Sequence, residues 1–420
     1  MSIENKHIEK KKSLTPKLRF KEFNGSWQMK YLRELLEFKN GINASKEQYG
    51  HGIKFINVLD ILNNDSIAYD TIIGSVDVDK TVASKYPVNY GDILFQRSSE
   101  TREEVGTACV YLDENKTAVF GGFVIRGRKI GEYDPIFLNK LLKTDNSRNE
   151  ITSKSGGSTR YNVGQETLSS IGLNFPTLSE QKKIASFLSA IDEKIQQLSR
   201  KKELLEQYKK GVMQQLFSGK LRFKDGNGKA FPKWGNRKLG DVLFEHKLNS
   251  TGKEEVFSVS VHKGLINQVE HLGRVFAAKN TDNYNLVKPN DIIYTKSPTG
   301  SFPLGIIKQS KVNKNVIVSP LYGVFTPETP GLGYMLNVYF ETPINVKNYL
   351  SSIIQKGAKN TINITNTTFL SKKMKLPISK EEQNQIGDFL FNIDLKINYV
   401  TNLITQTQTF KKGLLQQMFV

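Results

Sequence analysis

Glu180-Gln181-x-x-Ile184-x-x-Phe187-Leu188-x-x-Ile191-Asp192-x-Lys194-Ile195 occurs twice in this sequence, the second time as Glu382-Gln383-x-x-Ile386-x-x-Phe389-Leu390-x-x-Ile393-Asp394-x-Lys396-Ile397. Both copies continue into Lys-Lys-Gly-x-x-Gln-Gln-x-Phe, at residues 209–217 and 411–419. Earlier positions match as well, because Lys-Leu-Arg-Phe-Lys stands at residues 17–21 and again at residues 220–224. So many matches at one register indicate an internal repeat of about 200 residues.

The end of each copy has the periodicity of a long helix. Apolar residues step alternately by four and three, which is a heptad seam sustained for more than four heptads. We expect helices over residues 177–219 and 377–420, and capping boxes at Thr177-x-x-Glu180 and Ser379-x-x-Glu382 mark their starts. The residues expected to pack the helices together are Ile184, Leu188, Ile191, Ile195, Leu198, Ile386, Leu390, Ile393, Ile397 and Val400.

A seam of this length must be buried against another surface. Because the heptads match in both copies, we expect the two helices to pack against each other in antiparallel orientation. The alternative is that each helix is an unrelated amphipathic helix docked on its own domain. Lys209 and Lys411 also fall on seam positions, where a polar side chain weakens the packing locally.

The other segments, residues 17–176 and 220–376, contain short β-rich runs interrupted by Gly, Pro, Asn and Ser. We expect each to be a globular domain, preceded by a polar N-terminal tail over residues 1–16. The predicted fold class is therefore α/β (mixed α+β), in which two long antiparallel coiled-coil helices separate two globular domains. Outside the framework positions the two domains differ strongly in sequence, so we expect similar scaffolds with different loops.

The chain is basic, with 60 Lys and Arg against 41 Asp and Glu, a net charge of +19. Such an excess favours binding to polyanions, because Lys and Arg that neutralise phosphates release condensed counterions. A composition rich in Lys, Asn and Ile from an AT-rich genome would also account for it. The single cysteine, Cys109, and the lack of a long apolar run favour a cytoplasmic protein without disulfides or membrane spans.

The sequence contains no recognisable catalytic apparatus. There is no phosphate-binding loop motif, the five histidines are scattered, and one cysteine cannot build a zinc cluster. The segment Ser319-Pro320-Leu321-Tyr322 is faintly similar to the amine-binding tetrapeptide of DNA methyltransferases, but it lacks the second proline and a glycine-rich cofactor loop. We therefore predict no catalytic and no metal-binding residue in this chain.

Two polar loops in each copy are candidates for contact with DNA. Arg and Lys donate to guanine edges or phosphates, Asn pairs with adenine, and Ser and Thr contact either. The alternative is that these are ordinary polar surface loops. The candidate residues are Arg97, Ser98, Ser99, Thr101, Arg102, Ser158, Thr159, Arg160, Tyr161 and Asn162 in the first copy, and Lys296, Ser297, Thr299, Ser301, Lys356, Lys359, Asn360, Thr361 and Asn363 in the second.

The doubled pattern resembles the specificity subunit of type I restriction–modification systems. The resemblance covers the chain from Lys17 to the C-terminus, and its most specific features are Gly-Asp-Ile-Leu-Phe at residues 91–95 and the doubled Glu-Gln helix. It implies a non-catalytic subunit with two target-recognition domains, residues 17–176 and 220–376, each of which recognises one half of an asymmetric, bipartite site in double-stranded DNA. The helices at residues 177–219 and 377–420 would be the spacer between the domains.

The resemblance also implies partners and cofactors. The partners would be two modification subunits that methylate adenine and two restriction subunits that translocate and cut DNA. S-adenosylmethionine, ATP and Mg²⁺ would be bound by those subunits and not by this chain. The alternatives are a basic coiled-coil scaffold that binds RNA or non-specific DNA, and a recognition fragment with its own nuclease or methyltransferase activity.

Overall fold

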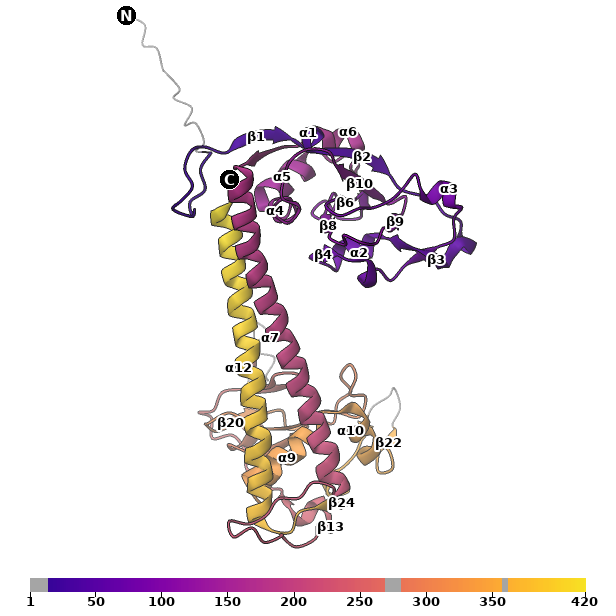
Figure 1. Cartoon of the computed structure of the whole chain (residues 1–420). Helices are drawn as coiled ribbons and strands as arrows, with labels where there is room; N and C mark the ends of the chain where they lie inside the picture. The colour runs from indigo at the N-terminus through magenta and orange to yellow at the C-terminus, as the bar shows by residue number, and fades with distance from the viewer. Residues whose placement is uncertain (1–13, 269–280, 357–361) are drawn as a thin grey trace, which may run out of the picture. The chain divides into compact units, whose positions relative to one another are not determined.

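A computed structural model describes residues 14–268, 281–356 and 362–420 (Figure 1). The chain divides into two compact units, which are residues 14–197 with 403–420, and residues 198–402. Each unit consists of one mixed α/β domain together with one segment of each long helix. Within the described residues, no helix combines the length and the apolar character needed to cross a membrane.

The long helices are α7 (Leu178–Ser218) and α12 (Lys380–Met418). At their starts the Thr177 and Ser379 hydroxyls each accept a hydrogen bond from the backbone N–H three residues later, at 3.4 Å, which is the hydroxyl half of the predicted capping boxes. The carboxylates of both glutamates bond to arginines. Gly219, with φ at +75°, follows the end of α7 in the left-handed conformation that terminates a helix.

The two helices pack against each other in antiparallel orientation, as expected. In the first unit Asp192 of α7 contacts Lys411 of α12, and in the second unit Lys209 of α7 contacts Asp394 of α12. Residue numbers therefore rise along one helix as they fall along the other. Eight of the ten predicted packing residues are buried, and Ile195 and Ile397, at equivalent positions of the repeat, are half-buried.

The domain of the first unit is built on a five-stranded sheet with the order β2-β10-β6-β8-β4. All four residues of its central strand are buried, which explains the continuous apolar run in the sequence. Its strands are β2 (Leu36–Asn40), β10 (Val124–Lys129), β6 (Ile93–Gln96), β8 (Ala108–Tyr111) and β4 (Ser66–Ile67). Two smaller sheets are formed by β5 (Ser75–Val76), β3 (Tyr49–Ile56) and β9 (Val119–Phe120), and by β1 (Gln28–Tyr31) and β12 (Gly172–Phe175). The helices are α1 (Leu32–Leu35), α2 (Val58–Leu62), α3 (Lys80–Ala83), α4 (Pro135–Leu141), α5 (Asp145–Ser153) and α6 (Gln165–Ser169).

The domain of the second unit repeats this plan with a four-stranded sheet of order β14-β21-β18-β19. Its strands are β14 (Leu243–Phe244), β21 (Gly323–Pro327), β18 (Ile292–Tyr294) and β19 (Ile307–Gln309). The pair β13 (Gly235–Lys238) and β24 (Lys373–Leu376) corresponds to β1 and β12. Further pairs are β15 (Phe257–Ser260) with β16 (Gly264–Asn267), and β17 (Asn285–Val287) with β20 (Val316–Val318). The helices are α9 (Pro330–Phe340), α10 (Pro343–Leu350) and α11 (Asn366–Ser371).

The same polar contact ties the start of each long helix to the segment that opens its repeat. The guanidinium of Arg19 donates two hydrogen bonds of 2.7 Å to Glu180, and Arg222 donates to Glu382 at 2.9 and 3.2 Å. Both glutamates are buried, and a buried carboxylate requires such a partner. The arginine of the repeated Lys-Leu-Arg-Phe-Lys motif therefore contacts the glutamate of the Glu-Gln motif in both copies.

Candidate nucleic-acid interface

In the first unit the two predicted loops lie side by side although about 60 residues separate them. The strand β7 (Ser98–Ser99) pairs in antiparallel orientation with β11 (Tyr161–Asn162). The Ser98 hydroxyl donates a hydrogen bond to the side-chain oxygen of Asn162. Residues that the sequence placed in two separate loops thus form one continuous surface.

The second of these loops is a tight hairpin closed by two backbone hydrogen bonds between Gly156 and Asn162, at 3.0 and 2.8 Å. Gly157 has a φ of +113°, and a Cβ atom there would lie 2.0 Å from the carbonyl oxygen of Arg160. Only glycine fits this position. The hairpin thereby presents Arg160 and Asn162 at the surface.

Most of the ten candidate residues in the first unit are accessible. Ser98 and Tyr161 are half-buried, and Ser99 is buried. The Ser99 hydroxyl donates to Glu104 at 3.0 Å and accepts from the Thr101 N–H at 3.2 Å, so it holds the loop together. The exposed residues are Arg97, Thr101, Arg102, Ser158, Thr159, Arg160 and Asn162.

The three arginines of this surface are only lightly engaged within the protein. Arg97 donates to the Gly122 carbonyl at 3.3 Å, and Arg102 donates to the Thr152 carbonyl at 3.2 Å. Arg160 lies 4.0 Å from the exposed carboxylate of Glu100. An exposed ion pair at that distance contributes little to stability, so a phosphate group can replace the carboxylate at low cost.

In the second unit the loop after β18 occupies the corresponding place. Ser297, Thr299 and Ser301 are exposed, and backbone hydrogen bonds between Thr299 and Phe302 close a turn. Lys296 is half-buried, with a positive φ of 54°. Burial lowers the pKa of Lys296, and the nearby Glu245 carboxylate opposes that shift only partly.

The remaining candidates of the second unit lie in the hairpin of β22 (Gln355–Lys356) and β23 (Ile362–Asn363), which pair in antiparallel orientation. In this hairpin Lys356 pairs with Ile362, and Asn363 pairs with Gln355. Lys359, Asn360 and Thr361 fall outside the described residues.

The turn that precedes β10 is not among the loops predicted from the sequence. It runs from Gly121 to Val124 and is closed by a 2.8 Å hydrogen bond between them. The Arg97 N–H donates to the Phe123 carbonyl at 2.9 Å, which joins this turn to the candidate loop. The sequence does contain a signal for this turn, because a short turn between two apolar runs precedes both β10 and β21. The turn was missed because only polar loops were considered as candidates for DNA contact.

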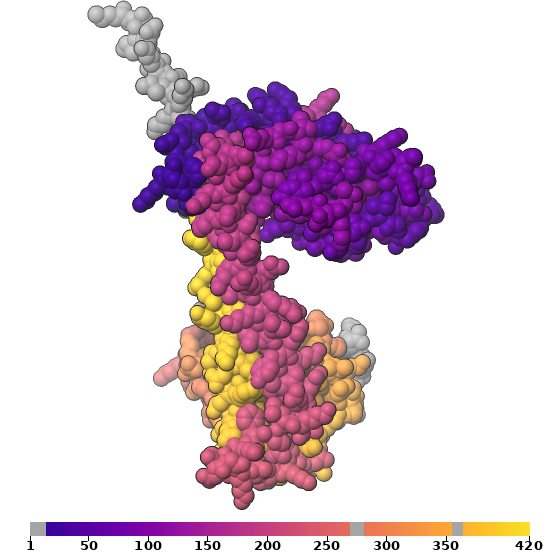
Figure 2. Space-filling view, viewed as in Figure 1, coloured from indigo at the N-terminus to yellow at the C-terminus, as the bar shows by residue number. Residues whose placement is uncertain are grey.

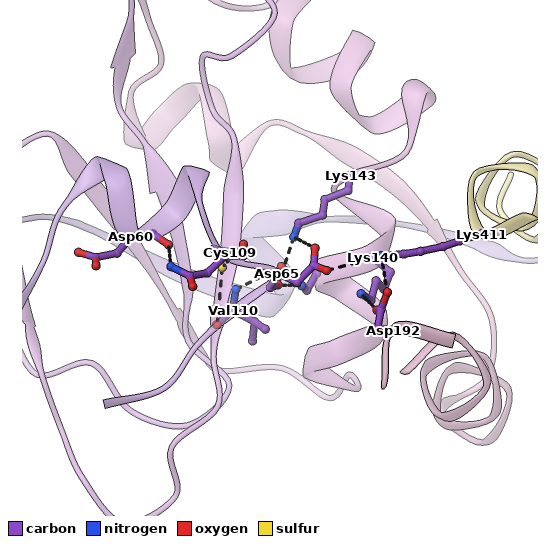
Figure 3. Close-up of polar contacts among 10 residues, drawn as sticks. Asp60, Asp65, Cys109, Val110, Lys140, Lys143, Asp192 and Lys411 are labelled. Atoms are coloured by element: carbon purple, nitrogen blue, oxygen red, sulfur yellow. Dashed lines mark hydrogen bonds and ion pairs between the residues drawn. The ribbon is translucent and has the colours of Figure 1, made fainter. Parts of the chain in front are cut away.

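A charged cluster fastens the first domain to both helices (Figure 3). Lys140 of α4 and Lys411 of α12 both form ion pairs with Asp192 of α7. Lys143 lies 3.2 Å and Lys411 lies 3.5 Å from Asp65. Burial alone would raise the pKa of Asp65, but the three lysines together lower it to about 2.

The described residues contain neither a cluster of metal-binding side chains nor a reactive thiol. Within them, no group of three or more His, Cys, Asp or Glu side chains is placed to hold a metal ion. Cys109 is buried and donates to the Asn64 carbonyl (Figure 3), and burial raises the pKa of its thiol to about 11. A thiol with such a pKa stays protonated and unreactive near neutral pH.

Comparisons with known proteins agree with this architecture. Residues 24–207 match the family described as type I restriction modification DNA specificity domain. A putative type I restriction enzyme MjaX specificity subunit of Methanocaldococcus jannaschii is 27% identical over 66% of this chain and 64% of its own length. The MjaIX specificity subunit of the same organism is 23% identical over 68% of each chain. This chain thus spans slightly under two thirds of the first of these relatives.

Two solved structures share the fold. One is the S subunit of a type I restriction–modification system from M. genitalium, with a TM-score of 0.58, 16% identity, and coverage of 97% of this chain and 99% of that chain. The other belongs to a study of assembly and conformational transition of the type I system, with a TM-score of 0.50, 13% identity, and coverage of 94% and 97%.

The chain thus combines two repeated α/β domains and an antiparallel helix pair with a match, over residues 24–207, to a DNA specificity domain. In sequence and in fold, the chain is similar to type I restriction–modification specificity subunits.

Proposed function

We propose that this chain recognises an asymmetric, bipartite site in double-stranded DNA and directs partner subunits to it. The observation that carries the proposal is the pair of equivalent units with an equivalent framework and different loops. In the loop after β6 the first unit has Arg97 and Arg102, whereas the loop after β18 in the second unit has Lys296 and Ser301 at the corresponding positions. Because side chains in such loops select base edges, two different loops select two different half-sites.

We assign the chemistry to the partners of this chain. Modification subunits methylate adenine and restriction subunits translocate and cut, and S-adenosylmethionine, ATP and Mg²⁺ are bound there. The chain itself contributes recognition and binds no cofactor. A subunit of this kind needs both a DNA surface and a surface for its partners.

The helix pair of the second unit offers such a partner surface. In the space-filling view both helix segments of this unit are uncovered along one face (Figure 2). Large apolar side chains are exposed on them, which favours a protein interface over solvent. They are Leu204, Tyr208, Phe391, Leu395 and Tyr399, with exposed fractions between 44% and 65%.

Co-expression with a type I modification subunit tests the proposal. Methylated adenines are then mapped across the host genome. We expect one bipartite motif, and replacement of residues 220–376 by the equivalent domain of another specificity subunit changes one half of it and leaves the other intact. An absence of methylation, with a modification subunit that works with another specificity subunit, would instead favour the basic scaffold that binds RNA or non-specific DNA.

A further inference from the structure

One large apolar side chain protrudes from each domain at the same position of the repeat. Phe123 is 65% exposed and Leu321 is 71% exposed. The sheet registers make them equivalent, because Ile93 pairs with Gly127 and its counterpart Ile292 pairs with Phe325. Phe123 lies four residues before Gly127 and Leu321 four residues before Phe325. Phe123 directly precedes β10, and Leu321 lies two residues before β21.

Both side chains occupy the third position of a β-turn. The Val124 N–H donates to the Gly121 carbonyl at 2.8 Å, and the Tyr322 N–H donates to the Ser319 carbonyl at 3.1 Å. A turn of this kind directs its central side chains away from the sheet. The repeat therefore preserves both the turn and the protruding apolar group.

The first turn packs closely against the segment that contains Gly41 and Asn43. A Cβ atom on Gly122 would lie 1.9 Å from the Asn43 side-chain oxygen, and one on Gly41 would lie 2.1 Å from the Gly121 carbonyl oxygen. The turn thus has no room to shift toward the neighbouring segment. Phe123 is held in place without being covered.

The second turn is fixed by different residues. The Asn285 side chain donates to the carbonyls of Pro320 and Tyr322, at 3.4 and 2.8 Å, on either side of Leu321. The Ser319 hydroxyl accepts from the Leu321 N–H at 3.3 Å. Different residues therefore fix the two turns, although each turn exposes a large apolar side chain at the same position.

A cationic residue lies beside the first of these turns. The Arg97 backbone donates to the Phe123 carbonyl, and the Arg97 guanidinium donates to the Gly122 carbonyl at 3.3 Å. In the second unit the β18–β21 ladder ends at Tyr294 and Gly323, and Lys296, the counterpart of Arg97, follows β18 by two residues. A single apolar group flanked by a cation suits a nucleic-acid duplex, whereas a stable protein interface needs about 800 Å² on each partner.

We propose that Phe123 and Leu321 contact base pairs, one in each half of the DNA site, as apolar side chains that pack on base edges or between base steps. The inference rests on the proposed function and adds two specificity-determining residues to it. Apolar side chains are used in this way on thymine methyl groups in the major groove and as wedges in the minor groove.

The test uses the full chain assembled with modification subunits and fluorescence anisotropy on duplexes that carry the mapped motif. The variants are Phe123→Ala and Leu321→Ala. Their controls are Ile130→Ala and Ile378→Ala, which truncate apolar side chains of 59% and 50% exposure elsewhere on the two domains. We expect each test variant to bind about tenfold more weakly, as loss of an apolar contact with one base implies, and the controls to bind normally.

Duplexes with one scrambled half assign each contact. Phe123→Ala should lose affinity only where the first half is intact, and Leu321→Ala only where the second half is intact. Wild-type affinity in both variants would overturn the inference and leave the proposed function standing. Weaker co-purification of modification subunits, with DNA affinity of the assembled complex unchanged, would assign the residues to a protein interface and overturn it as well. A wild-type complex that does not distinguish the motif from scrambled DNA would refute both proposals.

Discussion

Lys209 of α7 lies 2.8 Å from Asp394 of α12, and the equivalent residues of the repeat, Lys411 and Asp192, form the same ion pair with the two helices exchanged. Each lysine comes from one copy of the repeat and each aspartate from the other. The contact is therefore reciprocal, because each copy of the repeat supplies the lysine of one pair and the aspartate of the other. Lys209 and Lys411 interrupt the apolar seam, and each also forms a specific ion pair between the two helices.

The surroundings of the two ion pairs differ. In the second unit Lys209 also contacts Glu341 at 2.8 Å, and the Tyr334 hydroxyl donates to Asp394 at 2.6 Å. In the first unit a second lysine, Lys140, contacts Asp192 instead. Burial alone would lower the pKa of Lys209, but the two carboxylates raise it, so Lys209 stays charged.

Removing one charge of the reciprocal pair should destabilise the second unit. We expect Lys209→Met to lower the free energy of unfolding by about 3 kcal/mol, because a largely buried Asp394 loses its cation. Asp394→Asn should cost less in the Lys209→Met background than alone. Urea unfolding measures both, with Lys396→Met, on an exposed face of α12, as a control that should change stability by less than about 0.5 kcal/mol. An equal loss of unfolding free energy in Lys209→Met and Lys396→Met would argue against a stabilising ion pair between Lys209 and Asp394.

The hairpin of the first unit should tolerate a methyl group at one glycine and not at its neighbour. Gly157→Ala places a Cβ 2.0 Å from the Arg160 carbonyl oxygen at a positive φ, whereas a Cβ on Gly156 meets nothing within 4 Å. We expect Gly157→Ala to reduce methylation of the bipartite motif and Gly156→Ala to leave it unchanged. Genome-wide methylation mapping compares the two, and an equal effect of both substitutions would contradict the hairpin geometry.

Asn162 and Arg160 should affect DNA binding in different ways. If Asn162 contacts a base edge, Asn162→Ala relaxes specificity in one half-site by about 1–3 kcal/mol. Arg160, exposed and weakly paired, is placed for a phosphate, so Arg160→Ala should weaken binding to all sequences alike and reduce its salt dependence. Binding titrations at several salt concentrations separate these outcomes. Identical losses on cognate and scrambled DNA for Asn162→Ala would exclude a base contact.

DNA binding by the second unit should weaken at alkaline pH before that of the first. Burial lowers the pKa of Lys296 from its ordinary value of 10.5, so its positive charge is present at neutral pH and is lost as the pH rises through the lowered value. The first unit has an arginine, Arg97, at the corresponding place. Anisotropy titrations between about pH 7 and 10 should show the loss for wild type and not for Lys296→Arg. The same pH profile in both proteins would rule out Lys296 as its source.

The length of the helix pair should set the spacing of the two half-sites. Seven residues inserted into both α7 and α12, after residues 197 and 402, add about 10 Å to the rod while preserving the heptad phase. At about 3.4 Å per base pair, the methylated motif should gain about three base pairs of spacer with unchanged half-sites. Methylation mapping gives the motif directly, and an unaltered spacer would contradict this role of the helices.

The sequence by itself determined the repeat, the two long helices with their capping residues, and the mixed α/β character of the two domains. These features are encoded locally, because the heptad of α7 and the apolar run of β6 depend only on spacing along the chain. Tertiary structure alone decided which distant residues meet. It buried Ser99, joined β7 to β11, and paired Lys411 with Asp192, and each of these depends on a sheet register or a helix alignment that no local spacing specifies. The exposure of Phe123 and Leu321 has the same origin, since an apolar residue beside a strand is hidden or presented only by what the rest of the fold places over it.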